Sequence, residues 1–216
     1  LLLEHAAHVI AIEKDHRAST VLSSLLAAAG NRLTLIEADA LTSQIWNLGA
    51  PPRRIVANLP YNIATTLLIQ WLAHASCFDS MTLMFQSEVA KRITARPGDP
   101  AYGRLSVLTK WLADAEILFD VPASAFVPPP KVTSSVVQII PLPQPRYPCS
   151  QQALELITRT AFGQRRKMLR SSLKKINGEK LLAEAGVAPE SRPQDIDIER
   201  FCKLASLYES AGKTTF

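Results

Sequence analysis

The most informative segment of the chain reads Ile55-Val56-Ala57-Asn58-Leu59-Pro60-Tyr61-Asn62. Its short apolar, β-branched beginning is typical of a buried strand. Pro60 cannot donate a hydrogen bond to a sheet ladder and favours an extended conformation in the residue before it, so we predict that the strand ends here. In an open α/β sheet, ligands bind beyond the carboxyl ends of the strands. The residues from Asn58 to Tyr61 are therefore expected to face a ligand.

This turn suits the recognition of an amino group on a flat base. The side-chain oxygen of Asn58 and a backbone carbonyl beside Pro60 can each accept a hydrogen bond, and together they match the two hydrogens of an exocyclic amine. Tyr61 offers a flat face on which a base can stack. A four-residue match is weak evidence alone, because an ordinary strand-end turn with a core tyrosine has the same residues.

Composition indicates a globular protein with one large domain, or one domain and a small appendage. The chain has 216 residues, of which 47% are hydrophobic and 20% charged. Its net charge of +5 permits a nucleic-acid partner without requiring one. No apolar run approaches the roughly 18 residues needed to span a membrane, and no signal-peptide pattern is present.

The chain has three cysteines, Cys77, Cys149 and Cys202, which lie far apart in the sequence. An odd number of scattered cysteines is typical of reduced thiols in the cytoplasm rather than of a disulfide framework or a zinc site. The four histidines show no ligand spacing with the cysteines. We therefore predict a cytoplasmic protein without a metal site.

Short apolar runs alternate with helical patterns up to about residue 140. The expected strands are 8–13, 33–37, 55–58, 81–86, 117–121 and 134–140. The expected helices are 17–29, 42–46, 65–75, one that begins at residue 87, and 104–113. Strands that alternate with helices imply right-handed crossovers and a mainly parallel sheet, so the predicted fold class is α/β.

Three successive predicted strands end near a polar side chain, namely Glu13, Asp39 and Asn58. An acid after one strand suits ribose hydroxyls, as in dinucleotide-binding folds, and an acid after the next strand can accept a hydrogen bond from an adenine amino group. Each acid alone is more often a solvated carboxylate. Three such groups on consecutive strand ends favour a cofactor crevice.

A proline-rich run, Pro141-Leu142-Pro143-Gln144-Pro145-Arg146-Tyr147-Pro148, marks the predicted domain boundary. We assign residues 1–141 to the α/β domain, 142–148 to a stiff linker and 149–216 to a small all-helical domain. Helices are expected there at 151–162, 179–185 and 197–210.

The densest positive charge of the chain lies in the helical domain. Apolar Met168, Leu169 and Leu173 are interleaved with it, so one face can pack while the other meets phosphates. Such runs are usually solvated surfaces, but this pattern favours contact with an RNA backbone. The predicted RNA-binding residues are Arg165, Arg166, Lys167, Arg170, Lys174 and Lys175.

Several ordered motifs now resemble one family, the small-subunit rRNA adenine dimethyltransferases of the KsgA type. The motifs are Ala57-Asn58-Leu59-Pro60-Tyr61-Asn62, the segment 126–132 (Phe-Val-Pro-Pro-Pro-Lys-Val) and the segment 162–170 (Phe-Gly-Gln-Arg-Arg-Lys-Met-Leu-Arg). Segments 88–92 and 102–107 also fit. Each motif alone is modest, but the ordered set covers nearly the whole chain and is highly specific.

The resemblance implies a Rossmann-like methyltransferase domain followed by a small helical C-terminal domain. It implies an enzyme that uses S-adenosylmethionine to dimethylate N6 of two adjacent adenines near the 3′ end of small-subunit rRNA during ribosome assembly. The expected partner is the small ribosomal subunit, and the expected form is a cytoplasmic monomer.

The resemblance also implies roles for individual residues. Glu13 matches the acid that binds the cofactor ribose, and Asp39 matches the acid at the adenine amino group of the cofactor. Asn58 matches the residue that faces both the methionine moiety and the target base, and is therefore also assigned to cofactor binding. The implied catalytic set, in which Tyr61 and Phe126 sandwich the flipped adenine, is Asn58, Leu59, Pro60, Tyr61 and Phe126.

The chain departs from the family pattern at its beginning. The first strand and the glycine-rich loop of the family should precede Leu1, and the eight glycines present include no Gly-x-Gly. We therefore expect that an N-terminal segment is missing: either it lies upstream of Leu1, or the chain is a fragment. A true fragment should bind the cofactor poorly and can lose activity.

Three alternatives share some of these features. A large-subunit rRNA adenine methyltransferase of the macrolide-resistance type has the same chemistry, although the Asn-Leu-Pro-Tyr-Asn and Gln164-Arg165-Arg166-Lys167 patterns favour the small-subunit type. A non-catalytic RNA- or ribosome-binding assembly factor is a second alternative. A DNA amino-methyltransferase is a more distant third, because the basic helical tail fits rRNA better.

Overall fold

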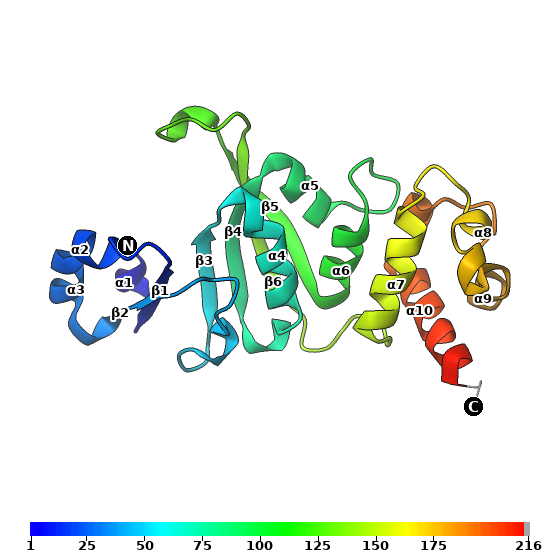
Figure 1. The fold of residues 1–216 in the computed structure, drawn as a ribbon, viewed down its shortest axis with the longest axis horizontal. Helices are drawn as coiled ribbons and strands as arrows, with labels where there is room; N and C mark the ends of the chain where they lie inside the picture. The colour runs from blue at the N-terminus through cyan, green and yellow to red at the C-terminus, as the bar shows by residue number, and fades with distance from the viewer. Residues whose placement is uncertain (214–216) are drawn as a thin grey trace.

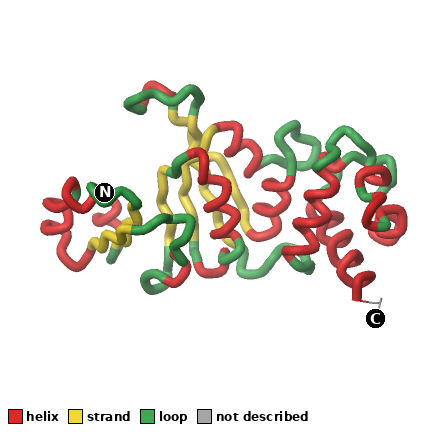
Figure 2. The backbone as a smooth tube through the Cα atoms, viewed as in Figure 1, coloured by secondary structure: helices red, strands yellow, loops and turns green. Residues whose placement is uncertain are grey.

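The computed structural model describes residues 1–213 and shows an elongated α/β protein (Figures 1 and 2). A small unit with two strands lies at one end, a four-stranded sheet lies in the middle, and a group of helices lies at the other end. No helix in the described part of the chain is long and apolar enough to cross a membrane.

The N-terminal unit is a parallel β-α-β arrangement. Strand β1 (Val9–Glu13) pairs in parallel with β2 (Leu33–Glu37), so that Glu13 lies opposite Glu37. The elements around them are α1 (Leu2–His5), α2 (Ala18–Val21), α3 (Ser23–Ala29) and the 3-10 turn η1 (Gly30–Arg32). The single helix predicted at 17–29 is thus two short helices. Within residues 1–58, Ala29 is the only buried residue.

The central sheet has the strand order β3-β4-β6-β5. Its strands are β3 (Arg54–Asn58), β4 (Ser80–Gln86), β5 (Ala113–Val121) and β6 (Ser134–Pro141). Only β3 and β4 are parallel, whereas β6 is antiparallel to both β4 and β5. The prediction of a mainly parallel sheet is wrong for the β5 and β6 side of the central sheet. The loop between these strands holds only the 3-10 turn η4 (Ala123–Ala125), and a parallel pair would need a crossover helix there.

The two sheets are separate within the described residues. β1 pairs only with β2, and β3 pairs only with β4. Figure 1 shows β1 and β2 set apart from the edge of the central sheet that β3 forms. The strands therefore do not bring their carboxyl ends to one continuous edge.

Helix α4 (Tyr61–Leu72) places the motif turn against the core. It buries Leu67, Leu68, Trp71 and Leu72, the apolar face that the sequence predicts. The helix begins earlier than predicted because Pro60 serves as its N-cap residue, and the Pro60 carbonyl accepts hydrogen bonds from Ile63 and Ala64. The 3-10 turns η2 (Ile45–Asn47), where a helix was predicted at 42–46, and η3 (Ala75–Cys77) flank this region.

Two further helices connect the sheet to the helical part. These are α5 (Ser87–Thr94), which begins where predicted, and α6 (Arg104–Leu112). The helical part contains α7 (Gln151–Phe162), α8 (Leu169–Ser172), α9 (Gly178–Ala185), α10 (Ile198–Lys213) and the 3-10 turns η5 (Lys174–Ile176) and η6 (Pro193–Asp195).

The predicted linker is held against α6 and β5. The Trp111 indole donates to the Tyr147 carbonyl at 2.8 Å, and the Arg146 guanidinium contacts Asp114 at 2.7 Å. Buried side chains also form one continuous cluster from Leu59 to Ala205. The central sheet and the helices therefore share a core across the proposed domain boundary.

Candidate active site

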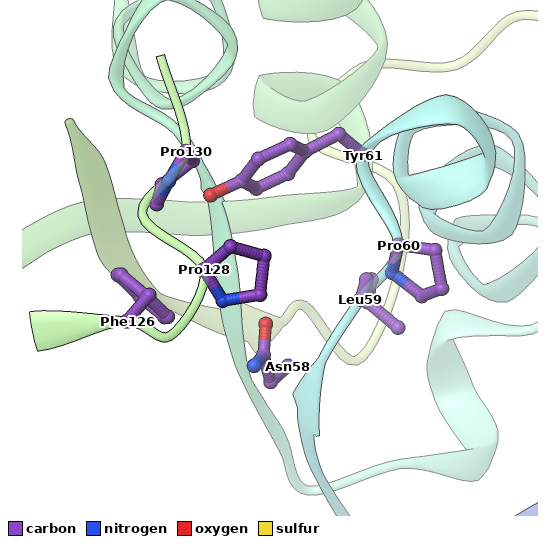
Figure 3. Close-up of a pocket in the computed structure, with 7 residues that line it drawn as sticks. All are labelled: Asn58, Leu59, Pro60, Tyr61, Phe126, Pro128 and Pro130. Atoms are coloured by element: carbon purple, nitrogen blue, oxygen red, sulfur yellow. The ribbon is translucent and has the colours of Figure 1, made fainter. Parts of the chain in front are cut away.

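A cavity of about 330 Å³ lies where β3 ends (Figure 3). It is lined by Asn58, Leu59, Pro60, Tyr61, Phe126, Pro128 and Pro130. The structure thus brings together all five residues of the predicted catalytic set. Phe126 and the two prolines come from the loop between β5 and β6, which is far from the β3 turn in sequence.

The turn presents its polar atoms in a defined way. Leu59 is 6% exposed and packs into the core, whereas the side chain of Asn58 is exposed beside the cavity. Because α4 already uses the Pro60 carbonyl, that oxygen is poorly suited to a ligand amine. The acceptor that we assign beside Pro60 is therefore the carbonyl of Leu59.

Tyr61 is held from a second element. Its hydroxyl lies 2.6 Å from Oγ of Ser134, the first residue of β6, and Ser134 is completely buried. The ring itself is half-buried and extends across the cavity toward Pro130 (Figure 3). No sequence motif points to Ser134, whose only local signal is a pair of serines that opens an apolar strand.

The neighbouring Ser135 fixes the ends of the loop that carries Phe126. Its hydroxyl donates to the Asp120 carboxylate at 2.5 Å and lies 2.8 Å from the Ser87 hydroxyl. The Ser87 amide donates to the Thr133 carbonyl. The end of β5, the start of β6 and the start of α5 are thereby joined beside the cavity.

The two predicted cofactor acids lie next to each other on the N-terminal unit. The Ala38 amide donates to the Glu13 carbonyl at 3.0 Å, which places the ends of β1 and β2 together. One Glu13 carboxylate oxygen accepts from the backbone amides of Lys14 and Asp15.

Asp39 has a cationic partner that the sequence analysis missed. The Lys14 ammonium donates to Asp39 at 2.9 Å, and the Leu41 amide donates to the other carboxylate oxygen at 2.9 Å. The hydrogen bond from Lys14 is the main reason that the pKa of Asp39 lies below its ordinary value, followed by the bond from Leu41. Both contacts therefore favour the charged form of the carboxylate, which can accept further hydrogen bonds.

The structure does not bring these acids together with Asn58. Neither acid lines the cavity, and among residues 1–213 no hydrogen bond that we observe joins either acid to it. The prediction of one crevice on three consecutive strand ends is therefore wrong for this structure. Glu13 and Asp39 lie in one place, and Asn58 lies in another. The reason is that β1 and β3 belong to different sheets.

The basic segment, defined as residues 165–175, has both engaged and exposed cations. Arg165 donates to the Pro100 carbonyl at 2.7 Å, and Arg170 lies 3.6 Å from Glu190. Leu169 and Leu173 are buried as predicted, whereas Met168 is 39% exposed. The exposed cations of this segment also include Arg166, Lys167, Lys174 and Lys175.

The arrangement defines a Rossmann-like methyltransferase in which a strand-end turn and an aromatic loop share one cavity. A solved dimethyladenosine transferase from Plasmodium falciparum is similar, with a TM-score of 0.80 and 26% identity over 98% of this chain and 85% of that one. The 23S rRNA methyltransferase ErmE has a TM-score of 0.70 and 25% identity, over 96% of this chain and 84% of that one.

The particular family follows from sequence comparison. Residues 1–210 match the family model described as ribosomal RNA adenine dimethylase. The chain therefore belongs to the ribosomal RNA adenine dimethylase family, and it is an S-adenosylmethionine-dependent methyltransferase.

Two bacterial relatives carry the name ribosomal RNA small subunit methyltransferase A. The protein from Rhodospirillum rubrum is 53% identical over 213 residues, which are 98% of this chain and 74% of that protein. The protein from Caulobacter vibrioides is 50% identical over 204 residues, which are 94% of this chain and 79% of that protein.

Proposed function

We propose that this protein dimethylates N6 of two adjacent adenines near the 3′ end of small-subunit rRNA, acting as a cytoplasmic monomer on assembling small ribosomal subunits. The observation that carries the proposal is the convergence of Asn58, Leu59, Tyr61 and Phe126 on one cavity. The names of the bacterial relatives support the small subunit as the substrate.

The cavity suits a single adenine base. Its volume of about 330 Å³ is at the lower end of the range for small-ligand pockets. Tyr61 and Phe126 provide aromatic faces, each worth about 1–3 kcal/mol of stacking per base. This gain offsets the few kcal/mol needed to unstack the target from its RNA.

The amino group is held by two acceptors. Asn58 Oδ1 and the Leu59 carbonyl accept its two hydrogens, which favours a pyramidal nitrogen with its lone pair free to react. Because the N6 lone pair of adenine is otherwise delocalised into the ring, this geometry raises its nucleophilicity. Among the described residues, none with a carboxylate, imidazole or ammonium group lines the cavity, so catalysis is assigned to positioning and electrostatics rather than to a strong base.

The N-terminal unit fits the methyl donor. S-adenosylmethionine supplies an activated methyl group on a sulfonium. Glu13 is assigned to the ribose hydroxyls of the donor and Asp39 to its adenine amino group. Two carboxylates at adjacent parallel strand ends match these hydrogen-bond donors, and the hydrogen bond from Lys14 lowers the pKa of Asp39.

RNA affinity is assigned to the helical part. Arg166, Lys167, Lys174 and Lys175 are exposed and suit contact with phosphates. Arg165 and Arg170 are assigned to RNA contact as well, and each also contacts the protein, at the Pro100 carbonyl and at Glu190 respectively.

The test is methyl transfer from labelled S-adenosylmethionine to small ribosomal subunits that lack the modification. Products are mapped by nuclease digestion and mass spectrometry. We expect N6,N6-dimethyladenine at two adjacent positions near the 3′ end. Product on large subunits alone would instead support the activity named for ErmE. Salt-dependent subunit binding without any product would support a non-catalytic assembly factor.

A further inference from the structure

Both ends of the Tyr61 side chain are fixed by the fold. Its backbone is the first turn of α4, directly after the N-cap residue Pro60. Its hydroxyl lies 2.6 Å from Ser134 Oγ, although the two residues are 73 positions apart in sequence. Because the hydroxyl oxygen lies on the axis of the second rotatable side-chain bond, contacts at both ends fix the direction and position of the ring rather than its rotation about that axis.

Ser134 is buried in the central sheet. It begins β6, where it lies opposite Gln86 of β4 and Val121 of β5, and its exposed fraction is 0%. Its backbone is therefore held by two neighbouring strands, which places its hydroxyl at the end of the central sheet. Ser134 also directly follows the loop that carries Phe126.

We propose that Ser134 is a positioning residue for methyl transfer, because its hydroxyl holds the far end of the Tyr61 ring and so fixes where the ring on which the target adenine stacks lies in the cavity. The inference rests on the proposed function, and it adds a residue outside the cavity lining. A ring that is already ordered loses little conformational entropy when the base binds. It also holds the base in line with the two acceptors, Asn58 Oδ1 and the Leu59 carbonyl.

Ser135 provides a matched control. It is the adjacent residue, it is 1% exposed, and it also loses buried hydrogen bonds when changed to alanine. Its partners are Asp120 and Ser87 rather than Tyr61. Both Ser134→Ala and Ser135→Ala are expected to lower stability, so a purely structural role for Ser134 would make the two variants behave alike.

The first measurement is independent of activity. The chain contains four tyrosines, and carbon-13 at the phenolic carbon of each ring reports the hydrogen bonding of its hydroxyl. Tyr61→Phe identifies the Tyr61 signal by its loss. We expect Ser134→Ala to shift the Tyr61 signal and Ser135→Ala to leave it in place. An unmoved signal in Ser134→Ala would overturn the proposal.

The second measurement is a double-mutant cycle on the methylation of small subunits. We expect Ser134→Ala to lower kcat/KM about tenfold or more without changing the Kd for S-adenosylmethionine. In a Tyr61→Phe background, the same change should cause no further loss, because the contact is already gone. Equal losses from Ser134→Ala in both backgrounds would refute the positioning role.

The two measurements separate this inference from the proposed function. If the unmodified chain methylates subunits but Ser134→Ala is as active as the unmodified chain, the inference fails and the function stands. If the unmodified chain yields no product, the proposed function fails, while the tyrosine signal still decides whether Ser134 anchors the ring.

Discussion

At the scale of single residues, the candidate chemistry depends on a few acceptor atoms and two rings. The Pro60 carbonyl is consumed by the first turn of α4, which leaves the Asn58 side chain and the Leu59 carbonyl for an amine. Asn58 lines the cavity, whereas none of residues 165–175, the basic segment that we assign to RNA, is among the described residues that line it. Catalysis and RNA affinity should therefore respond to different substitutions.

We predict that Asn58→Ala lowers methyl transfer by about a hundredfold or more, a loss typical of removing one positioned hydrogen-bonding group. The affinity for small subunits should stay unchanged. The measurements are labelled-methyl incorporation and subunit binding. Asn62→Ala is the matched control, because Asn62 lies in the same turn but does not line the cavity. Full activity in Asn58→Ala would remove the residue from the mechanism.

Lys14 allows a pH-dependent test of the cofactor acids. Its ammonium holds the pKa of Asp39 below the ordinary value, so Lys14→Ala should let that pKa rise. During acidification, the Asp39 carboxylate of the variant then takes up its proton at a higher pH, and cofactor affinity should fall at a higher pH. NMR of labelled aspartate and cofactor binding measure the two effects.

Arg17→Ala is the matched control for Lys14→Ala. Arg17 pairs with Asp15, and its hydrogen bond is the main cause of the lowered pKa of that carboxyl. The control should move the titration of Asp15 and leave Asp39 unchanged. An identical titration of Asp39 in the Lys14 variant and the unmodified chain would contradict the role of Lys14.

At the scale of elements, the basic segment is more than a charged surface. Its apolar residues Leu169 and Leu173 are buried, while Arg165 reaches across to the loop before α6. The segment is therefore a short, folded connection rather than one continuous helix. Its exposed cations project from this fixed base.

We predict that Arg166→Glu with Lys167→Glu weakens subunit binding and flattens its salt dependence, by about one unit of slope for each lost phosphate contact. Arg165→Ala should mainly lower thermal stability, because it removes a contact within the protein. Binding titrations at several salt concentrations separate the two variants. An unchanged slope in the double variant would make the segment a solvated surface only.

At the scale of the whole molecule, the core is unevenly distributed. It runs without interruption from the central sheet into the helical part, through side chains such as Phe85, Ile157 and Phe201. The N-terminal unit, in contrast, contributes only Ala29 to the buried residues. The proline-rich run lies against α6 and does not separate two cores.

Among the strands, we predict that amide hydrogen exchange is slowest in β4 and β6 and fastest in β1 and β2. The reason is that local stability increases with the amount of buried apolar contact. Addition of S-adenosylmethionine should slow amide exchange mainly at the carboxyl ends of β1 and β2. Glu13 ends β1, and Asp39 lies two residues after the end of β2. Equal protection of both sheets without the cofactor would show that the N-terminal unit has packing partners beyond those described.

The sequence by itself determined the local features of this protein. Pro60 determined where β3 ends, the apolar spacing determined the buried face of α4, and the ordered motifs determined the family. These features depend on backbone preferences and burial patterns within a few residues, so they can be recognised without the fold. The five residues around the cavity could also be named, because two motifs carry them.

Only the tertiary structure decided which distant groups meet. The hydrogen bond between Tyr61 and Ser134 and the antiparallel pairing of β6 join segments far apart in sequence. The contact of Lys14 with Asp39 depends on the parallel register of β1 and β2. Such contacts depend on how strands are ordered and oriented in a sheet, and no local pattern of side chains encodes that order.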